Sequence, residues 1–109
     1  MRGPRPGAAR VELFYLAGCR NARPALRLLR QVIAELDAPA AIAVRKVRSL
    51  REAERLSFAG SPTVRVDGHD VEPPRASLAS LSCRLYREGD AVRGYPSERT
   101  IRRALERRA

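Results

Sequence analysis

The sequence has no tryptophan, few aromatic residues and no long apolar run. Aromatic residues make up 5% of its 109 positions. A membrane-spanning helix needs about 18 or more consecutive apolar residues, and no such stretch occurs. The opening decapeptide "MRGPRPGAAR" is basic but contains no apolar segment, so it does not look like a secretory signal. We therefore expect a cytoplasmic protein that does not enter a membrane.

Cysteine is also scarce. Two cysteines are too few for a disulfide scaffold. The chain contains neither a glycine-rich phosphate loop nor a zinc-type cysteine cluster, so no motif predicts a cofactor or a metal. In a reducing compartment a free thiol is either buried and inert or reactive. Cys19 and Cys83 are therefore either structural residues or sites of chemistry.

Positive charge is abundant. The 22 basic and 12 acidic residues give a net charge of +10, and Lys46 is the only lysine. This excess reflects either a composition rich in arginine and alanine or an acidic partner. The arginines are spread along the chain and no aromatic residues alternate with them, so nucleic-acid binding is not favoured. Residues 1–10 predict a disordered basic tail, and 11–109 a single domain.

Alternating extended and helical patterns predict an α/β fold. Asn21, Ser49 and Ser97 are good N-caps, and Asp67-Gly68 is a strong hairpin signal. The predicted elements are a strand at 11–16, a helix at 22–36, a strand at 41–47, a short helix at 49–58, strands at 63–66 and 69–71, and a final helix from 97. A strand–helix–strand unit is parallel, and the hairpin adds antiparallel strands, so we expect a mixed sheet flanked by helices. Residues 73–95 form an insertion, which is either a second hairpin or an ordered loop.

This order, with "GC" after the first strand and "GSPTVRVDG" opening the third, resembles the thioredoxin-like fold over residues 11–72 and 97–108. "DVEP" and a late "SCRLY" are similar to small bacterial thioredoxin-like proteins, some labelled alkylmercury lyase-like. The resemblance implies a four-stranded sheet and a cis Pro62 facing Cys19. It also implies that Thr63 and the backbone around Ser61 receive a partner's main chain. The chain departs from the dithiol pattern, because Ala22 stands where a second cysteine would be.

Cys19 lies where the first strand gives way to a helix. Unpaired N–H groups at a helix start favour a negative charge, and Arg20 and Arg23 add positive charge beside the sulfur. These features favour the nucleophilic thiolate. The alternative is a buried structural cysteine.

Cys83 has three interpretations. It is a small apolar residue alternating with Leu81 and Leu85, a resolving thiol for Cys19, or one ligand of a soft-metal site shared with Cys19. Eleven residues separate Glu72 from Cys83, an extended reach of roughly 35 Å, so contact between the two cysteines is geometrically allowed.

The remaining polar residues give weaker indications of a functional site. His69 is expected at a surface turn, and Asp67 and Asp70 are expected as turn and edge residues. Tyr86 and Tyr95 either pack in the interior or wall the edge that carries Cys19. The arginines of the last helix predict a solvated face.

The sequence therefore predicts a thiol protein that exchanges disulfides with a protein or a low-molecular-weight thiol. A non-catalytic module with a basic surface is the second hypothesis, and a soft-metal or organomercurial-binding protein using both cysteines is the third. The sequence leaves the oligomeric state open.

Overall fold

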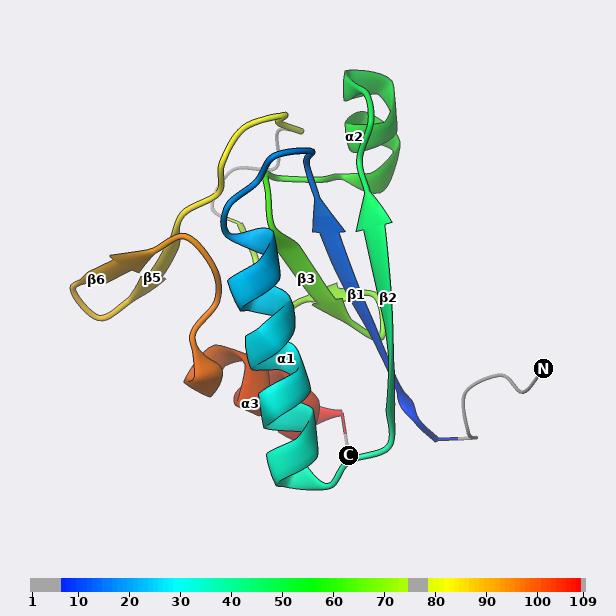
Figure 1. Cartoon of the computed structure of the whole chain (residues 1–109), viewed down its shortest axis with the longest axis vertical. Helices are drawn as coiled ribbons and strands as arrows, with labels where there is room; N and C mark the ends of the chain where they lie inside the picture. The colour runs from blue at the N-terminus through cyan, green and yellow to red at the C-terminus, as the bar shows by residue number, and fades with distance from the viewer. Residues whose placement is uncertain (1–6, 75–78, 109) are drawn as a thin grey trace.

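A computed structural model describes residues 7–74 and 79–108 (Figure 1). Its elements are β1 (Ala9–Tyr15), α1 (Ala22–Leu36), β2 (Ala40–Lys46), α2 (Leu50–Leu56), β3 (Thr63–Val66), β4 (His69–Asp70), β5 (Tyr86–Glu88), β6 (Ala91–Arg93) and α3 (Glu98–Arg107). β1 begins two residues before the predicted start at Val11, so Ala9 and Arg10 belong to the sheet and not to a tail. Residues 1–6 of the predicted tail lie outside the described residues.

Four strands form one mixed sheet in the order β2-β1-β3-β4. β1 pairs with β2 in parallel and with β3 antiparallel, and β4 pairs antiparallel with β3. A parallel neighbour requires a crossover connection, which α1 supplies between β1 and β2. The predicted four-stranded mixed sheet is confirmed.

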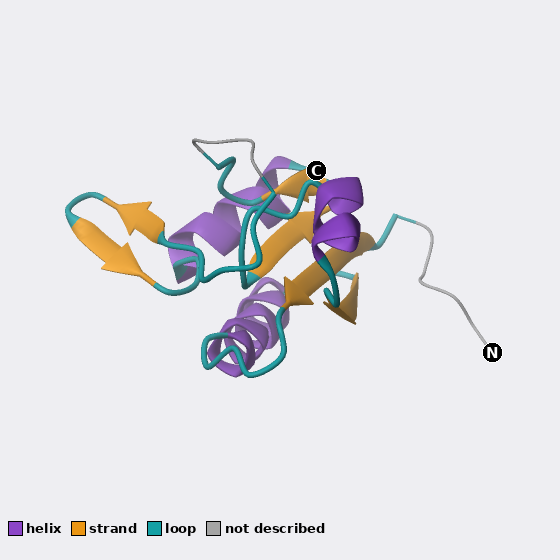
Figure 2. Cartoon of the chain, turned by 90° about the horizontal axis from the view of Figure 1, so that it is seen from above, coloured by secondary structure: helices purple, strands orange, loops and turns teal. Residues whose placement is uncertain are grey.

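Each face of the sheet has its own apolar core, because successive side chains of β1 point to opposite faces. Leu13 packs in one cluster with Leu29 of α1 and Ile101 of α3, all at most 1% exposed. Phe14 packs on the other face with Ala53 of α2 and Phe58. Burying one large apolar side chain stabilises the fold by about 1.5–3 kcal/mol. Seen from above in Figure 2, helices accordingly flank the sheet on both sides.

Two of the three predicted helix caps use their side chains. Ser49 Oγ accepts a hydrogen bond from the Glu52 N–H at 3.1 Å, and Ser97 Oγ accepts one from the Thr100 N–H at 3.1 Å. Asn21 precedes α1 as predicted, but its side chain makes no capping bond. It packs instead against Gly94, where a Cβ atom would come within 2.4 Å of Asn21 Nδ2. Asn21 thus joins the start of α1 to the insertion.

The insertion contains a second hairpin, formed by β5 and β6. The sequence allowed either a hairpin or an ordered loop for "SCRLYR" and "AVRGY" in this insertion, and the hairpin is confirmed. Figures 1 and 2 show it projecting from the body of the domain. Residues 75–78 of the insertion lie outside the described residues. Within the described part of the chain, no helix is long and apolar enough to cross a membrane.

Candidate functional site

Cys19 lies in the short loop between β1 and α1 and is partly buried. Its N–H donates to the carbonyl of Leu16 at 3.1 Å, and its carbonyl accepts from the Ala22 N–H at 3.3 Å. Gly18 has a φ of +77°, a conformation that side chains other than glycine rarely adopt. A tight turn of the backbone therefore places the thiol at the start of the helix, as predicted.

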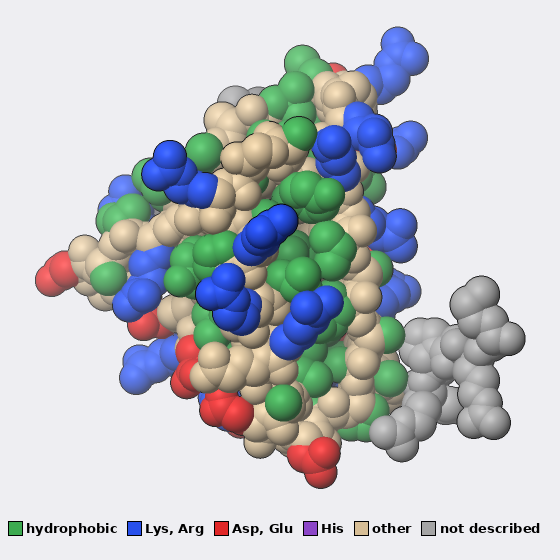
Figure 3. Space-filling model, viewed as in Figure 1, with side chains coloured by type: hydrophobic (Ala, Val, Ile, Leu, Met, Phe, Trp, Pro, Cys, Tyr) green, Lys and Arg blue, Asp and Glu red, His purple; other side chains and the backbone are tan. Residues whose placement is uncertain are grey.

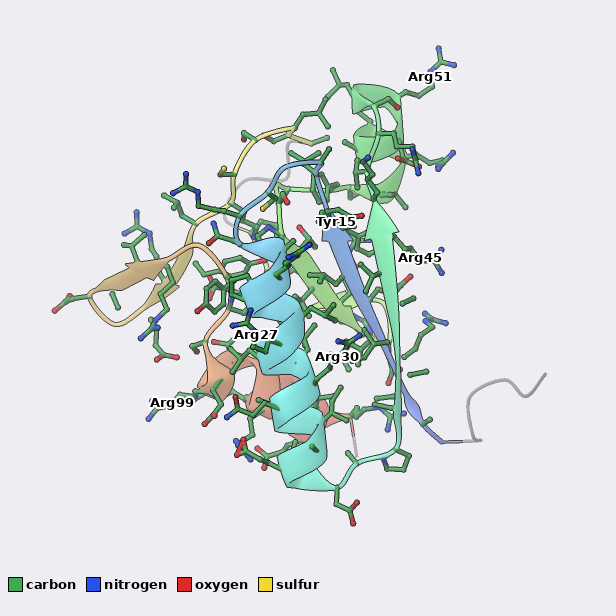
Figure 4. All side chains as sticks on the ribbon, in the orientation of Figure 1. Tyr15, Arg27, Arg30, Arg45, Arg51 and Arg99 are labelled. Atoms are coloured by element: carbon green, nitrogen blue, oxygen red, sulfur yellow. The ribbon has the colours of Figure 1, made fainter. Side chains whose placement is uncertain are left out.

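A groove of about 520 Å³ opens beside the thiol, between α1 and β2. Tyr15, Leu26 and Val44 give it apolar walls, and the exposed Arg20 and Arg23 contribute positive charge. Figure 3 shows Lys and Arg side chains on either side of an apolar strip on this face, and Figure 4 labels Tyr15 near the end of β1. The two predicted activating arginines and Cys19 thus line one groove.

Ser61 and Pro62 form a cis peptide bond just before β3, as the resemblance implied. Ser61 is 1% exposed, and its Oγ accepts a hydrogen bond from the Leu16 N–H at 2.9 Å. The carbonyl of the same Leu16 accepts the hydrogen bond from the Cys19 N–H. The cis-proline segment is therefore bonded directly to the turn that carries Cys19.

Cys83 lies next to Ser61 in an isolated parallel bridge. The Ser61 N–H donates to the carbonyl of Ser82 at 2.9 Å, and the Arg84 N–H donates to the carbonyl of Ser61 at 3.0 Å. Cys83 is exposed, and both cysteines are free thiols. Through Ser61, the chain segments of both cysteines are joined at the same end of the two central strands, where β1 ends and β3 begins.

The same contacts involve the three residues that are predicted to bind the main chain of a partner. Ser61, Pro62 and Thr63 are all buried, and both backbone groups of Ser61 are bonded within the chain. Thr63 Oγ1 donates to the carbonyl of Gly60 at 2.6 Å and accepts from Arg84 Nη1 at 3.2 Å. With residues 82–84 in this position, the N–H and carbonyl of Ser61 and the carbonyl of Pro62 are already bonded within the chain.

Arg84 anchors the insertion, and sequence reasoning did not single it out. Its side chain is 5% exposed, and its guanidinium donates two hydrogen bonds to Asp70, at 2.7 Å and 2.9 Å. It also donates to the carbonyl of Glu72 and lies 4.5 Å from the centre of the Tyr86 ring. Burial is the largest single influence on the pKa of Arg84 and lowers it, but the hydrogen bonds with Asp70 and the charges of Tyr86, Asp70 and Glu72 together outweigh burial and raise this pKa. Asp70, predicted as an edge residue, is thus also the partner of a buried cation.

Tyr86 completes this anchor. Its hydroxyl donates to the carbonyl of Pro62 at 2.5 Å, and burial raises the pKa of its phenol well above the usual value. Of the two predicted roles for Tyr86, packing is the one observed, directly against the cis-proline.

The expected alternation around Cys83 is present, but with the opposite face inside. Leu81 is 45% and Leu85 64% exposed, whereas Arg84 and Tyr86 are buried. Of the three interpretations of Cys83, the small apolar residue that shares a packed face with Leu81 and Leu85 is therefore not the one observed, since all three side chains are exposed. The period-two alternation of this segment gave no signal for which of its two faces would be buried, so it did not single out Arg84.

His69 is exposed at the start of β4, as predicted for a surface turn residue. Tyr95 packs against the core cluster of α1 and α3. Across residues 7–74 and 79–108, no three His, Cys, Asp or Glu side chains come close enough together to hold a metal ion.

No protein-family model matches this chain, and no curated protein is similar to it.

Proposed function

We propose that this chain is a thioredoxin-like thiol protein that exchanges disulfides, with Cys19 as the nucleophile and Cys83 as the resolving thiol. Three features of the fold support the proposal: the strand order β2-β1-β3-β4, a cysteine in the turn after β1, and a cis-proline directly before β3. Its partner is a protein or a low-molecular-weight thiol or disulfide.

The observation that carries the proposal is the position of Ser61 between the two cysteine segments. Its hydroxyl bonds the turn of Cys19, and its backbone bonds the residues on either side of Cys83. One buried residue thus bonds both segments, where β1 ends and β3 begins. In this proposal Cys83 is the second thiol that Ala22 cannot supply.

The exchange proceeds in two steps that balance. The thiolate of Cys19 attacks one sulfur of a partner disulfide, forms a mixed disulfide and releases the other half as a thiolate. The thiolate of Cys83 then attacks the sulfur of Cys19, forms the Cys19–Cys83 disulfide and releases the second half. The partner is reduced by two electrons and the chain is oxidised by two. A second thiol in excess reverses both steps and restores the reduced chain.

The test is oxidation of the full chain with one equivalent of a chromogenic aromatic disulfide, followed by intact mass and peptide mapping. We expect both aromatic thiolates to be released, the mass to fall by two hydrogens, and the two cysteine peptides to be linked. In Cys83→Ser, we expect one thiolate to be released and the other half to stay on Cys19.

Cys19→Ser is the matched control, and we expect it to form no internal link. Wild-type protein that keeps the aromatic group on Cys19, or carries a group on each cysteine without a link, would contradict the role of Cys83. A Cys19 that does not react at all would contradict the whole proposal. Binding of a partner that survives Cys19→Ser and falls steeply with salt would favour the basic-surface module instead.

A further inference from the structure

A second groove, of about 410 Å³, lies between α3 and the β5–β6 hairpin. Four arginines line it: Arg87 from β5 and Arg99, Arg103 and Arg107 from α3. None of its lining residues also lines the groove beside Cys19. The two grooves are therefore separate features of the molecule.

The three arginines of α3 are spaced four residues apart, so they follow one side of the helix. A helix rises 1.5 Å per residue, which separates neighbouring members of this row by about 6 Å along the axis. The hydroxyl-bearing Thr100 lies in the same lining, and Arg87 faces the row from the hairpin. Figure 4 shows Arg99 extending outward from the start of α3.

Within the described residues these four guanidinium groups have no acidic partner, in contrast to Arg102 of α3 and to Arg108, which directly follows α3. Arg102 pairs with Glu35 and Glu98, and Arg108 pairs with Asp67. Among residues 7–74 and 79–108, none of the four groove arginines forms an ion pair. Their positive charge is therefore balanced by no carboxylate of the described chain at contact distance.

Two carboxylates also line the groove, and each already accepts a hydrogen bond. Glu72 Oε2 accepts from the Arg87 N–H at 3.2 Å, and Glu88 accepts from the Ser97 hydroxyl. Four arginines against two glutamates leave the lining with two net positive charges. The excess charge lies toward α3, where the row of arginines runs.

The geometry points to a binding site in this groove for a small anion that carries several phosphoryl groups in series. A guanidinium group can donate two parallel hydrogen bonds to the oxygens of one phosphoryl group. A row of arginines can therefore bind successive phosphoryl groups. The groove volume lies in the range of small-ligand pockets. Among the described residues no aromatic side chain lines the groove, so they offer no surface on which bases of a nucleic acid could stack. This site is independent of the thiol chemistry.

The test is titration calorimetry of the full chain with tripolyphosphate at moderate salt. We expect saturable binding to one site that weakens at least tenfold in Arg99→Gln/Arg103→Gln. The matched control is Arg27→Gln/Arg30→Gln, which removes the same charge from exposed arginines of α1 outside both grooves. We expect the control to weaken binding less than twofold. Equal losses in the two double variants, or no binding by the wild type, would overturn the proposal.

A second variant and two further ligands sharpen the result. Arg87→Gln changes the hairpin wall without touching α3, and we expect it to weaken tripolyphosphate binding severalfold. A nucleoside triphosphate should bind within a few-fold of tripolyphosphate, since the phosphoryl groups carry recognition. Orthophosphate should bind more weakly, since one phosphoryl group reaches only part of the row. Binding confined to a single-stranded oligonucleotide would overturn the assignment to a small anion.

Discussion

The backbone of Cys83 lies beside that of Ser61, and the hydrogen bonds of this bridge flank the cysteine on both sides. Ser61 is the residue before the cis-proline and is almost fully buried. A segment of the insertion thus bonds the backbone of Ser61, which the resemblance assigns to the main chain of a partner. Cys83 is in consequence held in a fixed place by backbone contacts, although its own side chain is exposed.

Gly60→Ala is expected to displace the segment that carries Cys83. A Cβ at position 60 would lie 2.9 Å from Arg84 Cβ and 3.0 Å from the Ser82 carbonyl oxygen, and the φ of +125° disfavours any side chain. We expect a loss of about 2–3 kcal/mol in the free energy of unfolding. Formation of the Cys19–Cys83 disulfide should slow at least tenfold while alkylation of Cys19 changes little.

Gly89→Ala is the control for this substitution. Gly89 also has a positive φ, of +58°, but a Cβ there meets no atom within 4 Å. We expect a loss of about 1 kcal/mol from backbone strain alone and no change in the rate of disulfide formation. Equal effects of the two alanines on that rate would contradict a positioning role for residues 82–84.

Arg84→Met is expected to destabilise the fold by about 3 kcal/mol, measured as the free energy of unfolding in urea. The substitution keeps apolar volume but leaves the Asp70 carboxylate, 15% exposed, without its cation. Arg102→Met is the matched control, since its ion pairs lie at the surface and are worth at most about 1 kcal/mol. A loss no larger than in the control would show that Arg84 does not anchor the insertion.

Tyr86 makes the stability fall at alkaline pH. Because burial raises the pKa of its phenol, its contribution is complete below the usual tyrosine pKa of about 10 and is lost as pH rises beyond it. Tyr86→Phe should cost about 1 kcal/mol at neutral pH through the lost bond to Pro62, and should flatten the alkaline fall. Urea unfolding at pH 7 and pH 11 measures both effects, and an equally steep alkaline fall in the variant would contradict this assignment.

Asp67 contributes to stability in the opposite pH direction. Hydrogen bonds from the Arg108 guanidinium and the Arg10 N–H lower the pKa of its carboxyl group. Its contribution is therefore present at neutral pH and is lost as pH falls through the lowered pKa. The pair is exposed, so we expect Asp67→Asn to cost less than about 1 kcal/mol at pH 7. Asparagine tolerates the φ of +50° at this position, so the turn is kept.

The charges beside Cys19 should affect the rate of its reaction. Arg20 and Arg23 line the groove of the thiol, so their positive charge attracts an anionic reagent to it. We expect Arg20→Gln/Arg23→Gln to slow alkylation of Cys19 by the anionic reagent iodoacetate several-fold at pH 7. Arg27→Gln/Arg30→Gln, which removes equal charge farther along α1, is the control. Equal rates in the two double variants would contradict a local effect.

The sequence by itself predicted the order of the helices and strands, the parallel crossover and the turn that carries Cys19. These features depend on local patterns: apolar spacing, caps at Ser49 and Ser97, and the Asp67-Gly68 turn. Two of the three interpretations of Cys83 require it to lie close to Cys19, and the sequence could not choose among the three, because a reach of eleven residues permits contact without requiring it.

Only the tertiary structure decided which face of the "SCRLY" segment is buried. A period of two defines two faces, but nothing in the segment specifies which one meets the rest of the domain. The carboxylate of Asp70 and the carbonyls of Glu72 and Pro62 lie where Arg84 and Tyr86 can bond them, so the polar face turns inward and the leucines turn out. These partners come from elements distant in sequence. For the same reason Asn21, a good cap by its local sequence, packs against Gly94 instead.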